Sequence, residues 1–518
     1  MTAGLDALDG WWDDVIVGAG SSGAVLASRL SEQPGRRVLL VEAGSAQAAG
    51  AHAPPSPLGR PVLTGANWDY EASLGTDADG DRRYPYPVGK AVGGSSAVNG
   101  AIALRGLPAD FEEWSAAGGP DWTWDRVLPY FVRIEADADI IGQGHGRGGP
   151  IPIRRPARSR LGAVPQAFVT ACHAAGLPDL YDLNGSPGPG VGPVPSNSAG
   201  GRRVSTADAY LTPACDRPNL VLRERCHVLR VLVERGRAVG LEGVVDGRRS
   251  CRIRAGQVTL SAGAINTPAI LQRSGIGSAG QLRSVGIDPV ADVPGVGENL
   301  SDHPAVTIWG VPATASWTAD CPLHQVMARA LASNGRLDLG VFLATNVAGA
   351  DIPVIGRALG AETVMSVSAV LLAPASRGSV RLRDSSPQAK PAVTLGLASE
   401  RADIDELMEA TRLAWSIVRR TPLAGLVGRI VIWTDRMVSD SALLKTAIAR
   451  FACPLWHAAG TARMGPVTDP MAVVDARCRV HSVPGLHVVD ASVMPSVLRA
   501  TPNLSCIMLA ERVAEWMA

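Results

Sequence analysis

A strand, a glycine-rich turn, a helix and a second strand follow one another near the N-terminus, and this order restricts the fold more than any other feature. Asp14–Val17 has the apolar character of a short buried strand. Gly18–Gly23 (GAGSSG) then opens a helix that contains Ala24 to Leu30, and the strand Arg37–Val41 ends at Glu42. A unit of this kind and length predicts a parallel sheet that binds a dinucleotide.

Each glycine of the turn has a physical role in such a unit. Gly18 permits the tight turn, Gly20 lets the backbone approach a pyrophosphate, and Gly23 lets the helix pack closely on the strand. The free N–H groups of the helix N-terminus face the pyrophosphate, and Glu42 is placed to bind a ribose diol. The alternative is a purely structural turn followed by a surface glutamate. The predicted contacts are Gly18, Gly20, Ser21, Ser22, Gly23, Glu42 and Ala43.

A second complete fingerprint is missing, because Gly295–Gly297 lacks a third glycine and a following apolar helix. One dinucleotide is therefore expected.

The 49 basic and 48 acidic side chains leave a net charge of +1 without a basic run, so neither nucleic acid nor a membrane surface is an expected partner. The first ten residues lack the features of a secretory signal, which favours a cytoplasmic protein. Eight scattered cysteines without a C-x-x-C pair predict mostly free, buried thiols and no metal site.

Two glycine- and proline-rich stretches, Gly142–Arg160 and Asn184–Gly201, suggest a second lobe, and the latter is too rich in breakers to predict regular structure. The apolar run Val364–Ala375 is too short to cross a bilayer and predicts a buried strand. A strand starting at Val306 and an amphipathic helix over Ile404–Arg419 complete a predicted sheet with helices on one face.

Several segments together resemble the glucose-methanol-choline (GMC) oxidoreductase family. They are Gly89–Asp110 (GKAVGGSSAVNGAIALRGLPAD), Gly263–Gly277 (GAINTPAILQRSGIG), Val293–Pro304, Trp456–Gly465 and Leu486–Pro495. The resemblance implies an α/β (α+β composite) fold with a doubly wound, Rossmann-like FAD-binding domain. That domain would comprise residues 1–150, 200–305 and 451–518. A substrate domain on an antiparallel sheet would comprise residues 151–199 and 306–450.

The resemblance also implies FAD and further contacts with it. The edge of the flavin ring would contact Val92, Asn99, Gly100, Ala101 and Ile102, and the adenine would contact Val228. The ribityl chain, pyrophosphate or pyrimidine of FAD would lie near Asp490, Ala491 and Asn503. From the residues alone, Asn99 could equally be a turn-former. Some members attach FAD to a histidine at the position of Val98, so a non-covalent cofactor is expected here.

His457, in the small-residue loop Trp456–Thr461, is the main chemical candidate among nine histidines. An imidazole suits the removal of an alcohol's proton during hydride transfer to flavin N5. Trp456 is the candidate substrate contact, whereas His303 and His487 are expected to be structural. The family's usual second catalytic His or Asn corresponds to Thr501, which cannot act as a base near neutral pH, and Asn503 is a possible substitute.

These features predict FAD-dependent oxidation of a small-molecule alcohol, with oxygen or another electron acceptor. Two rival hypotheses stay open at this point. One is a GMC-like lyase of the hydroxynitrile-lyase type, which keeps FAD structurally. The other is a flavin-binding scaffold without catalysis, which the unusual Thr501 slightly favours.

Overall fold

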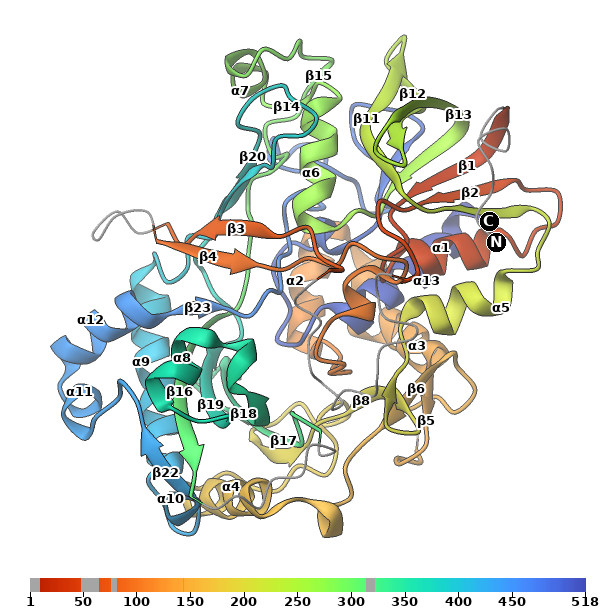
Figure 1. Ribbon diagram of the computed structural model, residues 1–518. Helices are drawn as coiled ribbons and strands as arrows, with labels where there is room; N and C mark the ends of the chain where they lie inside the picture. Colours follow the sequence, from red (N-terminus) through yellow and green to blue (C-terminus); the bar gives the residue numbers. More distant parts are fainter. Residues whose placement is uncertain (1–9, 48–64, 76–81, 143, 314–321) are drawn as a thin grey trace.

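Two large β-sheets, each with its own hydrophobic core, dominate the structure (Figure 1). The computed structural model describes residues 10–47, 65–75, 82–142, 144–313 and 322–518. Residues 1–9, on which the expectation about a signal rests, and Cys321 lie outside the described residues. Within the described ranges, no helix is both long and apolar enough to cross a membrane.

The first sheet confirms the expected α/β architecture, with parallel strands at its centre. Val15, Ile16, Leu39 and Leu40 are completely buried, as expected for parallel strands covered on both faces. β11 and β12 extend the sheet as an antiparallel pair, and β24 pairs with β13. The strand order is β10 (Leu220–Arg223), β2 (Val38–Val41), β1 (Trp11–Val17), β13 (Arg249–Leu260), β12 (Arg237–Val245) and β11 (Cys226–Glu234), with β24 at Leu486–Val488.

Helices from the two ends of the chain pack together beside this sheet. α1 (Gly23–Leu30) lies against α13 (Asn503–Met517), as Figure 1 shows. Arg29, in the last turn of α1, forms an ion pair with Glu511 of α13, with 2.9 Å between Nη2 and Oε1. Segments almost five hundred positions apart therefore form one corner of the molecule.

The second sheet is antiparallel and carries helices on one face, as predicted. α9 (Arg401–Val418), α4 (Ala163–Ala174) and α12 (Ser441–Phe451) pack against it. The apolar side of α9 is buried there, and its charged residues lie mostly on the other side. The strand order is β22 (Val427–Ile430), β16 (Pro304–Pro312), β19 (Thr363–Leu371), β18 (Leu339–Ala348), β17 (Val326–Ala330) and β7 (Gly190–Pro193), with β23 (Cys453–Pro454) beside β16.

The expectation that Asn184–Gly201 has no regular structure is wrong. This segment contains β7, which pairs with β17, and β8 (Ser196–Ala199). A Cβ on Gly192 would lie 2.1 Å from the carbonyl oxygen of Leu180. The glycine therefore permits a close backbone approach within the sheet, where composition alone indicates a strand breaker.

The remaining elements connect the two sheets and cover their edges. Two small sheets have the orders β20–β21–β3–β4 and β5–β6–β8–β9, and β14 pairs with β15. The helices are α2 (Pro108–Gly118), α3 (Trp124–Ile134), α5 (Thr212–Ala214), α6 (Gly263–Arg273), α7 (Ala279–Ser284), α8 (Pro353–Leu359), α10 (Leu423–Leu426) and α11 (Asp435–Ser439). The strands are β3 (Tyr70–Ser73), β4 (Arg83–Tyr86), β5 (Glu135–Asp137), β6 (Ile151–Arg154), β9 (Arg202–Arg203), β14 (Ile276–Gly277), β15 (Ala291–Asp292), β20 (Ser379–Arg381) and β21 (Ala392–Thr394).

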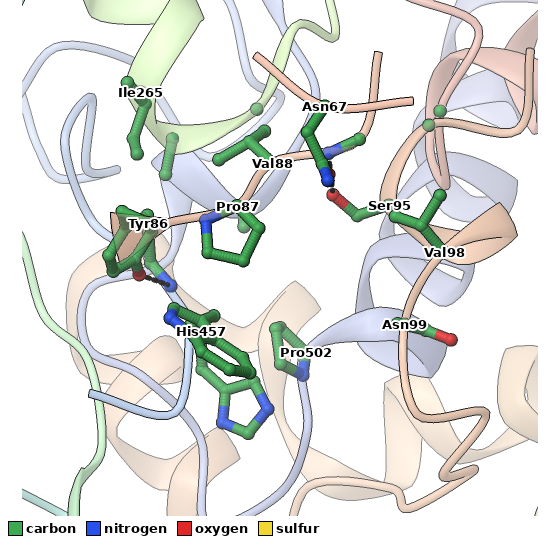
Figure 2. Close-up of a pocket in the computed structure, with 18 of the residues that line it drawn as sticks. Asn67, Tyr86, Pro87, Val88, Ser95, Val98, Asn99, Ile265, His457 and Pro502 are labelled. Carbon is green, nitrogen blue, oxygen red and sulfur yellow. Dashed lines mark hydrogen bonds between the residues drawn. The ribbon is translucent and has the colours of Figure 1, made fainter. Parts of the chain in front are cut away.

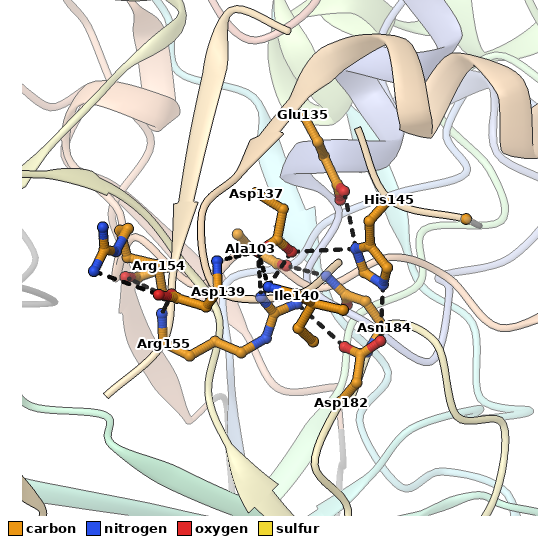
Figure 3. Close-up of polar contacts among 12 residues, drawn as sticks. Ala103, Glu135, Asp137, Asp139, Ile140, His145, Arg154, Arg155, Asp182 and Asn184 are labelled. Carbon is orange, nitrogen blue, oxygen red and sulfur yellow. Dashed lines mark hydrogen bonds and ion pairs between the residues drawn. The ribbon is translucent and has the colours of Figure 1, made fainter. Parts of the chain in front are cut away.

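A buried ion network lies around β5 and β6 (Figure 3). His145 places Nδ1 3.3 Å from Glu135 and 3.2 Å from Asp137, while its Nε2 lies 2.8 Å from Asp182. Hydrogen bonds with Asp137, Asp182 and Glu135 raise the pKa of His145 to about 10. Arg105 forms an ion pair with Glu135, and Arg155 forms one with Asp137. The negative charges of the three carboxylates are thus balanced by two arginines and the protonated His145. This balance explains the cluster as an ion network that needs no metal ion.

Candidate functional site

A cavity of ≈ 490 Å³ extends from the glycine turn to the antiparallel sheet. This volume is within the range of small-molecule and cofactor sites. Figure 2 shows Tyr86 and His457 on one side of it and Val98 and Asn99 on the other. The candidate residues that line it are Gly18, Gly20, Ser21, Ser22, Glu42, Ala43, Asn99, Gly100, Ile102, Val228, Trp456, His457, Asp490, Ala491, Thr501 and Asn503. Gly23, Val92 and Ala101 are not part of the lining.

Backbone packing explains the glycines of the turn. Gly18 has φ +97°, and a Cβ there would lie 2.5 Å from the carbonyl oxygen of Ser261. A Cβ on Gly23 would lie 1.9 Å from the carbonyl oxygen of Gly18, so this residue supports the site from behind. The nearest atom to a Cβ on Gly20 is 3.7 Å away, which leaves its backbone accessible from the cavity. The turn therefore has the close-packed base and open face that a pyrophosphate needs.

The N-terminus of α13 meets the same turn. Ser21 Oγ donates to Asn503 Oδ1 at 2.8 Å, and Ser22 Oγ donates to the carbonyl oxygen of Cys506 at 3.0 Å. Two helices thus present their N-terminal ends to this part of the cavity. Their combined dipoles favour a negatively charged group there.

Glu42, at the end of β2, is buried beside the turn. One carboxylate oxygen accepts the N–H of Ala19 at 2.9 Å, and the other accepts the N–H of Gly44 at 2.8 Å. Burial raises the pKa of Glu42 to about 7, and these hydrogen bonds oppose the rise. The carboxylate is thus held in a fixed position at the cavity wall, where it can accept hydrogen bonds from hydroxyl groups.

Asp490 connects β24 to the N-terminus of α6. Its carboxylate accepts the N–H of Gly263 at 2.8 Å and the hydroxyl of Thr267 at 2.6 Å, and it also caps the turn at Ser492. Asp490 therefore orients the backbone at the cavity wall. On the opposite side, Asn99 Oδ1 accepts the N–H of Ala101 at 2.9 Å. The Asn99 side chain thus closes a local turn, and the residue also lines the cavity, so the turn does not decide between its two expected roles.

The loop that carries His457 is anchored by a buried aspartate. Asp302 accepts the N–H of His457 at 2.8 Å and the hydroxyl of Tyr86 at 2.5 Å. The N–H of Ala458 in turn donates to the Tyr86 hydroxyl oxygen at 3.1 Å. Burial raises the pKa of Asp302 to about 7. These contacts fix the backbone of the loop at the cavity wall.

His303 directly contacts His457, with 2.8 Å between the two Nδ1 atoms. Nε2 of His303 lies 2.8 Å from the carbonyl oxygen of Leu498 and 3.1 Å from that of Leu372. A carbonyl oxygen only accepts, so Nε2 of His303 carries a hydrogen. Burial lowers the pKa of His303 to about 4, so the ring is neutral and its Nδ1 accepts.

The hydrogen between the two rings therefore belongs to His457. With its Nδ1 protonated, a neutral His457 has its lone pair on Nε2. Burial, followed by the nearby His303, lowers the pKa of His457 well below its ordinary value. The arrangement thus produces a neutral imidazole with a defined basic nitrogen. His303 was expected to be structural, and its contact with His457 adds that it orients this ring. The sequence signal for this position is the SDHP segment, which belongs to one of the segments that carry the resemblance.

The other candidates occupy different parts of the cavity. The Thr501 hydroxyl donates to the carbonyl oxygen of Ile102 at 3.2 Å. Trp456 is 38% exposed, and its Nε1 donates to the carbonyl oxygen of Pro85 at 3.2 Å. Asn503, in contrast, binds the glycine turn through Ser21. Thr501 and Trp456 therefore bind other parts of the backbone, whereas Asn503 belongs with the residues around the glycine turn Gly18–Gly23.

Comparisons with known proteins show which family the chain resembles. Family models described as GMC oxidoreductase match residues 12–305 and 374–510. The chain is 37% identical to 5-(hydroxymethyl)furfural oxidase of Methylovorus sp., over 97% of this chain and 98% of the relative. It is 34% identical to mitochondrial choline dehydrogenase of Homo sapiens, over 97% of this chain and 89% of the relative. The crystal structure of pyridoxine 4-oxidase from Mesorbium loti is similar with a TM-score of 0.88 and 33% identity, covering 98% of this chain and 99% of that one.

Proposed function

The chain belongs to the GMC oxidoreductase family and is an FAD-dependent enzyme acting on CH–OH donors, and from this premise we propose that it oxidises an alcohol to an aldehyde or ketone with His457 as proton acceptor. The observation that supports this role most is the contact between His303 and His457 at 2.8 Å. It leaves the lone pair of His457 on Nε2, in a residue that lines the cavity. A neutral imidazole at this place can accept the hydroxyl proton as the carbinol carbon is oxidised.

The residues around the glycine turn fit FAD. The close-packed turn and the two helix N-termini suit its pyrophosphate, while Glu42 suits a ribose diol. Bound FAD would supply the hydride acceptor for oxidation of the alcohol and the electrons for oxygen or another acceptor. We propose that FAD is held without a covalent bond, because Val98 offers no nucleophile for attachment.

Thr501 is our proposed second partner of the substrate hydroxyl. Its oxygen keeps acceptor capacity while it donates to Ile102, and rotation of the hydroxyl can turn the donor toward the substrate. Asn503 is the weaker candidate for this role, since its side-chain oxygen already binds Ser21 at the turn. We assign Asn503 to the cofactor side of the cavity.

The role of His457 can be tested by anaerobic flavin reduction. His457→Ala should slow reduction by an oxidisable alcohol about 10²-fold or more. His173→Ala, which alters a histidine paired with Asp179 on the surface, is the matched control and should reduce at the wild-type rate. Acid precipitation measures FAD content in each protein and should release all flavin into the supernatant.

Two outcomes would contradict the proposal. An unchanged reduction rate in His457→Ala at full FAD content would exclude His457 as the proton acceptor. Flavin that stays with the washed precipitate would exclude non-covalent binding. A substrate that is consumed without any flavin reduction would instead indicate the lyase alternative.

A further inference from the structure

One face of the antiparallel sheet forms the far wall of the cavity. Alternate residues of three strands line it, namely Thr307 and Trp309 of β16, Phe342 and Ala344 of β18, and Ser366 and Ser368 of β19. The intervening residues belong to the hydrophobic core beneath α9. β19 thus has an apolar face toward the helices and a face with two serines toward the cavity.

The strand register arranges these residues in two rows. In the first row, Thr307 lies opposite Ser368, and their hydroxyl oxygens are 3.0 Å apart. Cys453 Sγ lies 4.0 Å from Thr307 Oγ1, on the strand β23 that leads to His457. The first row is therefore the one beside the His457 loop, and its hydroxyl groups already bind each other.

The second row is Trp309, Ser366 and Ala344, about 7 Å further along the strands. Ser366 is 4% exposed, and its hydroxyl makes no hydrogen bond with any residue that the structure describes. The Ser366 oxygen does not belong to the fully buried polar atoms without a partner, so it is accessible from the cavity. Its position in the cavity lining makes this hydroxyl available to a ligand, which would replace water as its partner.

His324 lies beside this second row. Its Nδ1 is 3.3 Å from the carbonyl oxygen of Leu343, the residue before Ala344, so Nδ1 carries the hydrogen. Burial lowers the pKa of His324, and the ring is neutral. Nε2 is then an acceptor, and it has no hydrogen-bond donor among the described parts of the chain.

We propose that Ser366 and His324 bind an uncharged hydrogen-bond donor on the far end of the substrate, so that the enzyme prefers an alcohol with a flat apolar body and a second hydroxyl or N–H group. The aromatic side chains of Tyr84, Trp309 and Phe342 in the lining suit the flat body. His324 Nε2 requires a donor, and Ser366 can accept from the same group. This inference rests on the proposed function, because it assumes that the reacting hydroxyl is at His457.

The test compares two alcohols of nearly equal size, 4-hydroxybenzyl alcohol and 4-methylbenzyl alcohol. The wild type should favour the hydroxyl compound about 10-fold in kcat/KM, measured by anaerobic flavin reduction. Ser366→Ala should reduce this ratio to less than about 3-fold. Ser368→Ala, in which the lost hydroxyl belongs to the first row, is the matched control and should keep the ratio.

A binding measurement separates this proposal from the proposed function. 4-Hydroxybenzamide and 4-methylbenzamide have no oxidisable carbinol, and calorimetry with the holoenzyme should show the same preference and the same loss in Ser366→Ala. If neither alcohol reduces the flavin while the amides are discriminated, the proposed function is wrong for such alcohols and the binding inference stands. Equal kcat/KM values for both alcohols, or a ratio unchanged by Ser366→Ala, would overturn the inference and leave the proposed function intact.

Discussion

The contact between His303 and His457 makes a prediction about which nitrogen of His457 is basic. In the wild type, His303 Nδ1 accepts the Nδ1 hydrogen of His457 at 2.8 Å. An asparagine amide can replace an imidazole Nδ1, whereas a glutamine amide reaches the position of Nε2. His303→Asn should therefore still accept the Nδ1 hydrogen of His457. His303→Gln should still donate to the carbonyl oxygen of Leu498 but should lose the hydrogen bond with His457.

The size of the effect follows from the lost hydrogen bond. A buried N–H without an acceptor costs about 1–3 kcal/mol, and His457 can avoid this cost by moving its hydrogen to Nε2. That tautomer cannot accept a proton at Nε2. At 1.4 kcal/mol per factor of ten, the loss amounts to about 5- to 150-fold in the rate of flavin reduction. His303→Gln should show this loss, and His303→Asn should recover most of the wild-type rate.

Stopped-flow mixing of each anaerobic variant with an alcohol that the wild type oxidises measures this rate through the flavin absorbance. Equal FAD content in the two variants serves as the control for folding, because both substitutions alter the same buried position. Wild-type reduction in His303→Gln would refute the tautomer argument. A defect of equal size in both variants would indicate that His303 only supports the packing of the loop.

Two further predictions concern other residues. Thr501→Val should lower kcat/KM about 10-fold, since a neutral hydrogen bond contributes about 0.5–1.5 kcal/mol; a loss as large as that of His457→Ala at normal FAD content would contradict our division of roles. The pKa of His145 is about 10 in the folded protein, whereas its ordinary value is 6.5. The protonated ring therefore stabilises the folded protein fully below pH 6.5, and this stabilisation is lost as the pH rises toward 10. The contribution to the free energy of unfolding should fall by up to about 1.4 kcal/mol per pH unit in this range, so urea midpoints of wild type and His145→Gln should converge between pH 7 and 9, and parallel midpoints would contradict the network.

Local features of the sequence predicted the FAD-side architecture well. The glycine turn between Asp14–Val17 and Arg37–Val41 uses contacts among neighbours in the chain, and the structure has β1, α1 and β2 there. The helix expected over Ile404–Arg419 is α9, Arg401–Val418. Apolar periodicity identifies such elements because each one buries a continuous face.

Contacts between distant segments could not be predicted in the same way. His303 and His457 are 154 positions apart, and neither local pattern indicates that the rings touch. β7 was missed for a related reason, since its Gly192 permits a backbone approach to Leu180 that only the folded structure contains. The boundaries of the discontinuous domains stay predictions. The roles assigned to His457, Thr501 and the other site residues also stay predictions, and the experiments above test several of them.

The packing of α1 against α13 has a consequence for how the chain folds during its synthesis. Ser21 and Asn503, which meet at the glycine turn, are 482 positions apart. At about 5–20 residues per second, a ribosome needs roughly half a minute or more after making one to make the other. α1 also packs against β1, β2 and Ala207–Leu211, so it is the contact with α13 that is delayed by this time. A polypeptide that stops before α13 would lack the contact between Asn503 and Ser21, so the proposed FAD site at the glycine turn is complete only once α13 has been made.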